Sequence, residues 1–99
     1  MTVAMAHRYR SDLTEDEQEH VIAIMRVLRV KLGNWRGVEL ALPLAHSSLW
    51  SVVSGRAPVT PMIAFRVARA FDAPVGAVLT GQALPAGTCR HCGRAADDE

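Results

Sequence analysis

Helix-breaking residues divide this sequence into one long segment and several short ones, and their spacing limits the folds open to the chain. No glycine or proline occurs before residue 33, whereas one or the other recurs from there to residue 81. The alternation of apolar and polar residues that is typical of β-strands is not visible in any segment. We therefore expect an all-α fold in which one long helix precedes several short helices.

The long helix is predicted to begin after Thr14 and to run to Leu32. The sequence Thr14-Glu15-Asp16-Glu17 fits a capping box, in which the threonine side chain accepts a bond from a backbone amide and Glu17 bonds back. The acidic residues also lie near the positive end of the helix dipole. Gly33 and Asn34 tolerate left-handed backbone, so they form a suitable end for this helix.

The apolar face of the long helix is wider than the single stripe, roughly 100° across, that a surface helix normally carries. One stripe consists of Val21, Met25, Leu28 and Leu32, and a second stripe beside it consists of Ile24, Val27 and Val30. The second stripe fits either a homodimer interface or a helix that crosses the centre of one small core. We take Ile24, Val27 and Val30 as the candidate dimer interface.

Four shorter helices are expected, at residues 35–42, 46–54, 61–71 and 75–79. Pro43 and Gly55 end the first two of them. Thr60-Pro61 is a strong start signal, because threonine caps a helix and proline at the first helical position loses no hydrogen bond. Asp72-Ala73-Pro74 separates the last two helices, and Gly81 ends the fifth.

These expectations divide the chain into an N-terminal arm at residues 1–13, a helical domain at residues 14–81 and a flexible tail at residues 82–99. The tail is rich in alanine, proline, glycine and charged residues. A chain of 99 residues can build one core of this kind. Neither a secretion signal nor an apolar stretch long enough for a membrane is visible, so we expect a cytoplasmic protein.

Charge is distributed unevenly along the chain. Between Val21 and Arg94 there are nine arginine or lysine residues and two acidic residues, while most acidic residues lie near the two ends. A basic body suits a polyanionic partner such as DNA. Solvated surface charge on a helical protein explains the same pattern, so charge only permits the DNA interpretation.

Three motifs in residues 44–81 occur in a known order. Ser54-Gly55-Arg56 ends one short helix, Thr60-Pro61 begins the next, and Leu79-Thr80-Gly81 closes the last. This segment resembles the phage Cro/repressor family of helix-turn-helix regulators, also called the xenobiotic-response-element-like family. The resemblance implies a five-helix, lambda-repressor-like domain that binds double-stranded DNA sequence-specifically, works as a homodimer and regulates transcription as a repressor.

The same resemblance implies which residues touch DNA. The positions that read base edges in the major groove fall on His46, Ser47, Trp50 and Ser51. The positions that contact phosphate fall on Asn34, Trp35, Arg36 and Arg56.

The tail contains Cys89 and Cys92 at the spacing of zinc ligands. Structural zinc needs four ligands, and the remaining donors are His91, three distant histidines, Asp97 and Asp98. Three explanations remain open: a zinc site at Cys89 and Cys92, thiols without metal, and a redox pair.

An enzyme is not expected. The sequence has no nucleophile–base pair, phosphate-binding loop or carboxylate pair at a usable spacing.

The alternative to DNA binding is a protein-interaction module on the same fold, such as an antitoxin or an adaptor. In that case Trp50, Val53 and Trp35 would face a protein partner. Four other large apolar residues are expected in the core and imply no cofactor site: Met25, Met62, Phe65 and Phe71.

Overall fold

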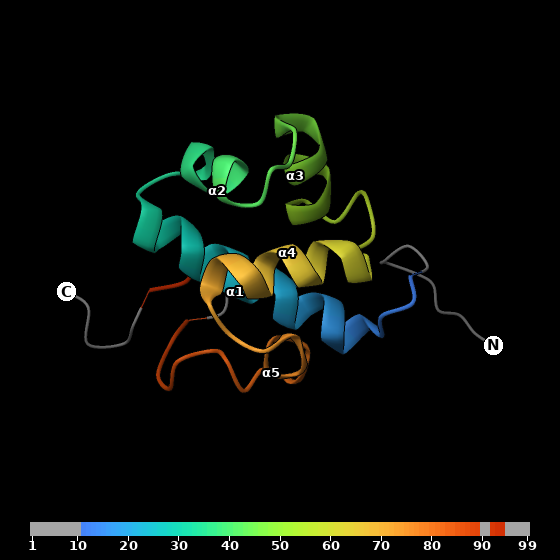
Figure 1. Cartoon of the computed structure of the whole chain (residues 1–99), viewed down its shortest axis with the longest axis vertical. Coiled ribbons are helices and arrows are strands. Elements are labelled where there is room, and N and C mark those ends of the chain that lie inside the picture. Colours follow the sequence, from blue (N-terminus) through green and yellow to red (C-terminus); the bar gives the residue numbers. More distant parts are fainter. Residues whose placement is uncertain (1–10, 90–91, 95–99) are drawn as a thin grey trace.

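The computed structural model describes residues 11–89 and 92–94, and these residues form five helices and no β-strand (Figure 1). None of these helices is long and apolar enough to cross a membrane. The prediction of an all-α fold is confirmed, and every helix begins and ends within one residue of its predicted bounds. The helices are α1 (Glu15–Leu32), α2 (Trp35–Ala41), α3 (His46–Val53), α4 (Pro61–Phe71) and α5 (Val75–Thr80).

Both ends of α1 have the predicted caps. The Thr14 hydroxyl accepts a bond from the Glu17 amide at 3.1 Å, and the Glu17 carboxylate accepts one from the Thr14 amide at 2.8 Å. At the other end Gly33 has a φ of 93°, and its amide donates to the Arg29 carbonyl at 2.8 Å. The capping box and the left-handed glycine therefore set the length of this helix.

Side chains also cap α2 and α4. The Asn34 side-chain oxygen accepts a bond from the Gly37 amide at 2.8 Å. The Thr60 hydroxyl accepts one from the Ile63 amide at 3.3 Å, and Pro61 occupies the first turn of α4. Because these are local bonds between neighbours in sequence, they explain why the helix starts could be predicted.

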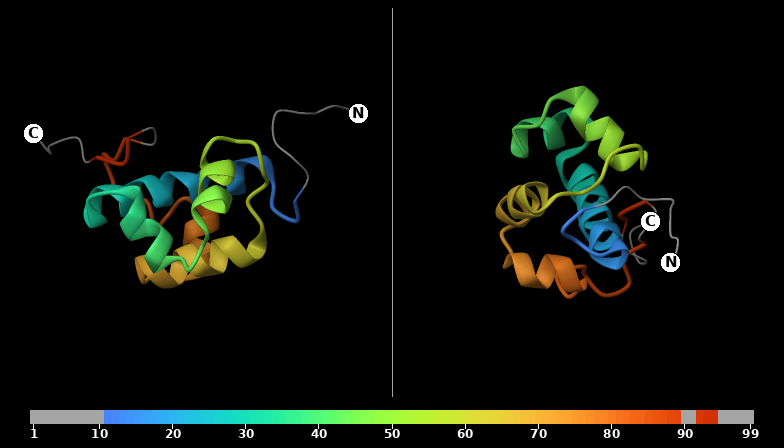
Figure 2. Two further views of the ribbon diagram at one scale, coloured as in Figure 1. Left: turned by 90° about the horizontal axis from the view of Figure 1, so that it is seen from above. Right: turned by 90° about the vertical axis from the view of Figure 1, so that its right-hand side faces the viewer.

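The long helix α1 runs through the middle of the molecule and contacts α2, α4 and α5. Figure 2 shows α2 and α3 together on one side of α1, with α4 and α5 on other sides of it. Its residues Val21, Ile24 and Met25 are fully buried. Thus α1 is the central element on which the short helices are positioned.

The expected dimer interface does not form an exposed stripe. Within the single chain the side chain of Ile24 has no exposed surface, Val27 is 4% exposed, and Val30 is half-buried. In this conformation Ile24 and Val27 cannot face a second subunit, so that assignment is corrected. The wide apolar face of α1 is instead covered by the chain's own helices and tail, and a dimer remains a prediction that needs another surface.

The segments that flank the five helices also pack against them. The Ser11 hydroxyl donates to the Val59 carbonyl at 2.5 Å, although Ser11 lies in the segment predicted as an arm. In the tail, Ala83 and Leu84 pack against the core, and the Ala83 amide donates to the Ala77 carbonyl at 3.0 Å. The described part of the tail is therefore attached to the body; residues 1–10, 90–91 and 95–99 lie outside the described residues.

Candidate nucleic-acid interface

Helix α3 lies at the edge of the molecule, beside α2 and above α4 in the view of Figure 1. Leu49 and Val52 attach it to the core, with 2% and 3% of their surface exposed. Because these two residues lie on one face of the helix, the opposite face is presented to solvent. That face carries the predicted base-reading residues.

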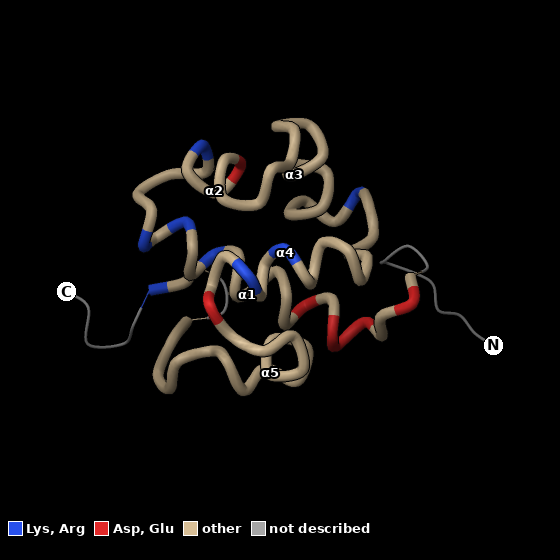
Figure 3. The backbone as a smooth tube through the Cα atoms, viewed as in Figure 1, with Lys and Arg blue, Asp and Glu red and all other residues tan. Residues whose placement is uncertain are grey.

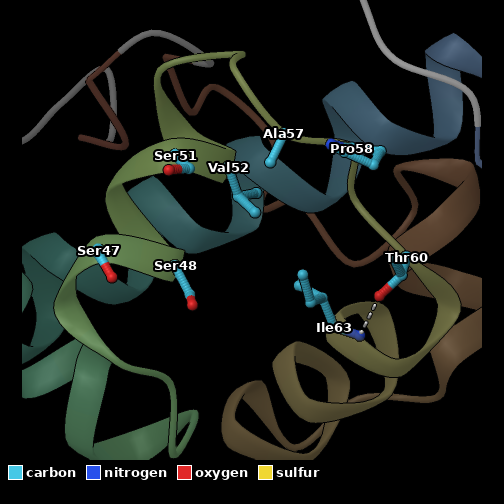
Figure 4. Close-up of a pocket in the computed structure, with 8 residues that line it drawn as sticks. All are labelled: Ser47, Ser48, Ser51, Val52, Ala57, Pro58, Thr60 and Ile63. Carbon is cyan, nitrogen blue, oxygen red and sulfur yellow. Dashed lines mark hydrogen bonds between the residues drawn. The ribbon is translucent and has the colours of Figure 1, made fainter.

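The four candidates for base reading lie in two settings. His46 and Trp50 are exposed, and the surface of Trp50 is 53% accessible. Ser47 and Ser51 instead line an open cleft between α3, the loop after it and the start of α4 (Figure 4). Ser51 is half-buried there, and its carbonyl accepts bonds from the amides of Arg56 and Ala57 at 2.8 and 3.1 Å.

The cleft has a volume of about 400 Å³ and mixed walls. Helix α3 contributes three serines beside Val52, and the loop and α4 contribute mainly apolar side chains. Its lining residues are Ser47, Ser48, Ser51 and Val52 of α3, Ala57, Pro58 and Thr60 of the loop, and Ile63 of α4. An open, shallow surface of this kind suits contact with a larger molecule rather than enclosure of a small one.

His46 is held by an acidic residue that no sequence motif singles out. Its ring atom Nδ1 lies 2.6 Å from Oε2 of Glu39 on α2, and Arg36 lies 3.9 Å from the other carboxylate oxygen. The Glu39 side chain is only 10% exposed, whereas His46 is 75% exposed. His46 can therefore offer only its other ring nitrogen, Nε2, to a DNA base.

Two of the four candidates for phosphate contact have a structural role, and the other two are exposed arginines. The Asn34 side chain caps α2, and Trp35 is half-buried against the core with the Arg29 guanidinium 5.7 Å from its ring centroid. Arg36 and Arg56 are exposed, the first on α2 and the second just after α3. Both arginines thus lie on segments that adjoin α3 in the chain.

Charge separates along the molecule (Figure 3). Asp12 and the acidic residues of the first turns of α1 lie at one end, and most basic residues lie nearer α2 and the C-terminal half of α1. Arg66 on α4 has a structural contact, because its guanidinium donates to the Pro43 carbonyl at 3.0 Å. Near α3 the exposed positive charge therefore comes from Arg36 and Arg56.

Only one of the three residues expected to face a protein partner is exposed. Trp50 is exposed, but Val53 and Trp35 pack against the core. Other large apolar side chains are exposed instead, with accessible fractions of 69% for Leu40, 54% for Met62 and 57% for Phe65. The expectation that Met62 and Phe65 belong to the core is therefore wrong, because α4 turns the face that carries them to solvent.

The two cysteines lie in the last described turn of the chain. Cys89 is exposed, Cys92 is half-buried, and they are not joined in a disulfide. Among the residues that the structure describes, no group of three or more histidine, cysteine, aspartate or glutamate side chains could hold a metal ion. The described residues of one copy thus present two thiols, which is half of the donor set of a structural zinc site.

Comparison with known proteins does not assign this surface. No protein-family model, curated protein or solved structure matches the chain.

Proposed function

We propose that this protein binds double-stranded DNA sequence-specifically, with α2 and α3 acting as a helix-turn-helix, and that it represses transcription. The observation that carries the proposal is the setting of α3. Two buried residues, Leu49 and Val52, hold the helix at the molecular edge, and its polar N-terminal end is exposed. Two exposed arginines lie nearby in the chain, Arg36 on α2 and Arg56 just after the C-terminal end of α3. The resemblance of residues 44–81 to phage repressors supports the same function.

The chemistry of this end of α3 suits a DNA groove. The major groove is about 12 Å wide and admits one helix. His46 Nε2 and the hydroxyl of Ser47 can donate to or accept from base edges, and Trp50 can contact a thymine methyl group. Arg36 and Arg56 would bind phosphates on either side, which positions the helix without reading sequence.

The proposal also covers the oligomeric state and the location of the protein. Operators of helix-turn-helix proteins are commonly read as two half-sites about one helical turn apart, so we expect a homodimer. We further expect a cytoplasmic protein that acts by binding and has no catalytic site of its own.

A protein-interaction module is the second candidate, and the exposed apolar side chains favour it. Trp50, Leu40, Met62 and Phe65 each have more than half of their surface accessible. Large exposed apolar groups mark surfaces that meet partners. An antitoxin or adaptor would bind its protein partner through such groups, and that binding would depend little on phosphate contacts.

Selection from a random library of duplex DNA tests the proposal directly. We expect a short motif to be enriched, and fluorescence anisotropy to show tighter binding to that motif than to a scrambled duplex. If each dimer makes about 4–8 phosphate contacts, the logarithm of the binding constant should fall with the logarithm of salt concentration with a slope of about −4 to −7. No enriched motif together with a slope near zero would overturn the DNA proposal and favour the protein partner.

A further inference from the structure

Backbone hydrogen bonds join Cys89 to the two described residues that follow Cys92, and we call residues 89 and 92–94 the cysteine turn. The Cys89 amide donates to the Arg94 carbonyl at 2.9 Å, and the Gly93 amide donates to the Cys89 carbonyl at 2.8 Å. These two bonds join the first residue of the turn to its last two. Cys89 and Cys92 therefore belong to one hydrogen-bonded turn rather than to an extended tail.

This turn is fixed to the body of the protein by Gly93. Gly93 is buried with a φ of 78°, and a Cβ atom added there would clash with the Arg26 carbonyl oxygen and lie 2.7 Å from the Val27 amide nitrogen. The residue after the second cysteine thus packs directly on the backbone of α1, and only glycine fits. The residue next to one candidate ligand, Cys92, is therefore fixed on the body of the protein, and such support favours metal binding.

We propose that two copies of this chain share one zinc ion, bound by Cys89 and Cys92 of each copy. A Cys-x-x-Cys pair has the spacing of structural zinc ligands, and such sites bind the ion tetrahedrally through four donors. The described residues of one copy supply only two of these donors. Cys89 is exposed and Cys92 is half-buried, so a second copy can reach them.

Charge around the turn favours this arrangement. Four thiolates around Zn²⁺ leave a net negative charge, and each thiol loses its proton to solvent when the metal binds. Arg94 lies exposed in the same turn, and Arg26 lies on the stretch of α1 that Gly93 covers. The charge of Arg94 would offset part of this negative charge. The site does not depend on DNA binding, and it gives the chain a dimer contact that does not use Ile24 or Val27.

Native mass spectrometry of the full chain without an affinity tag, kept reduced and titrated with Zn²⁺, measures the stoichiometry. We expect a dimer that holds one zinc ion, and we expect Co²⁺ in its place to give the thiolate-to-metal charge-transfer absorption. Cys89→Ser and Cys92→Ser should each abolish that absorption and the metal-dependent dimer. Far-UV circular dichroism should remain unchanged, because the five helices are complete by Gly81.

A pair of glycine variants tests whether the packing of Gly93 on α1 contributes to zinc binding. Gly93→Ala keeps all four thiols but displaces the turn from α1, so it should weaken zinc affinity by about 10–100-fold, the usual effect of losing outer support of metal ligands. Gly76→Ala is the matched control, because a Cβ atom there has no neighbour within 4 Å. The control should bind zinc like the unaltered chain.

Several results would overturn the shared site. One zinc per chain in a monomer means that local donors complete the site, and no stoichiometric zinc means that the thiols bind none. Zinc retained by Cys92→Ser would show that the turn is not the site. None of these results would affect the DNA proposal, whose readout is binding to duplex DNA.

Discussion

The Nδ1 atom of His46 lies 2.6 Å from Oε2 of Glu39, so a nearly buried carboxylate on α2 holds the first residue of α3. The bond joins the two helices of the proposed helix-turn-helix across the turn at Pro43. Because the imidazole is held through one nitrogen, Glu39 sets the direction in which the other nitrogen points. We regard Glu39 as a positioning residue for base reading.

Replacement of Glu39 by glutamine should therefore separate affinity from sequence preference. Loss of a negative charge beside the DNA should raise affinity for random duplex, while loss of the fixed His46 ring should lower preference for the selected motif by about 5–30-fold, or roughly 1–2 kcal/mol. Anisotropy titrations on both duplexes measure this. Glu19→Gln, an equal charge change on exposed α1, is the control and should leave the preference intact. Equal shifts on both duplexes for Glu39→Gln would mean that Glu39 does not position a reader.

Base-reading and phosphate-binding residues should respond differently to truncation. His46→Ala and Ser47→Ala should each cost about 1–3 kcal/mol on the selected motif and little on random DNA. Arg56→Ala should weaken both complexes alike and make the salt slope shallower by about 1 for each phosphate that the arginine binds in the unaltered protein. Arg69→Ala removes an exposed arginine from α4 and serves as the charge-matched control. Should Arg56→Ala and Arg69→Ala change the slope equally, a bound phosphate at Arg56 is ruled out.

The fluorescence of Trp50 can report contact with DNA directly, because the two tryptophans differ in exposure. Trp35 is half-buried and Trp50 is 53% exposed. In a Trp35→Phe background, duplex DNA carrying the selected motif should shield Trp50 from acrylamide quenching and reduce the quenching constant at least about twofold. Helix α3 in the groove would bury this ring. Unchanged quenching at saturating DNA would place Trp50 outside the complex and leave it as a protein-contact residue.

The helix bounds could be predicted because their signals are local in sequence. Thr14 with Glu17, and Thr60 with Pro61, form their caps with residues a few positions away, and the structure contains those caps. The contact between Glu39 and His46 could not be predicted, because it depends on how the chain turns at Pro43.

Burial of the α1 stripe could not be predicted for a related reason. Periodicity shows which face of a helix is apolar, but not how much of the chain returns to cover it. Gly93 lies against the backbone of Arg26 and Val27 although these residues are far apart in sequence. Phe65 is likewise expected in the core as a large apolar residue, whereas the structure leaves it exposed.

Charged substitutions in α1 test whether Ile24 and Val27 belong to the core of a single chain. Ile24→Glu together with Val27→Glu should unfold the protein, because both side chains are buried within one chain and a buried unpaired carboxylate is strongly unfavourable. Far-UV circular dichroism should show the loss of helicity. Val30→Glu, at a half-buried position of the same stripe, is the control and should remain helical. A folded monomer from the double variant would restore these residues to a dimer interface.

Gln18 supports the loop beneath the proposed DNA interface, and its removal should destabilise the protein. The side chain is 3% exposed; its oxygen accepts a bond from the Val59 amide at 2.9 Å, and its nitrogen donates to the Leu13 carbonyl at 3.2 Å. Gln18→Leu keeps the volume but leaves the buried Val59 amide without its acceptor, which should lower the free energy of unfolding by about 1–3 kcal/mol. Urea denaturation measures that loss, and hydrogen exchange at Val59 should accelerate because local opening becomes easier. Gln82→Leu, at an exposed position, is the control. Unaltered stability and exchange in Gln18→Leu would show that this glutamine does not hold the loop that leads from Arg56 into α4.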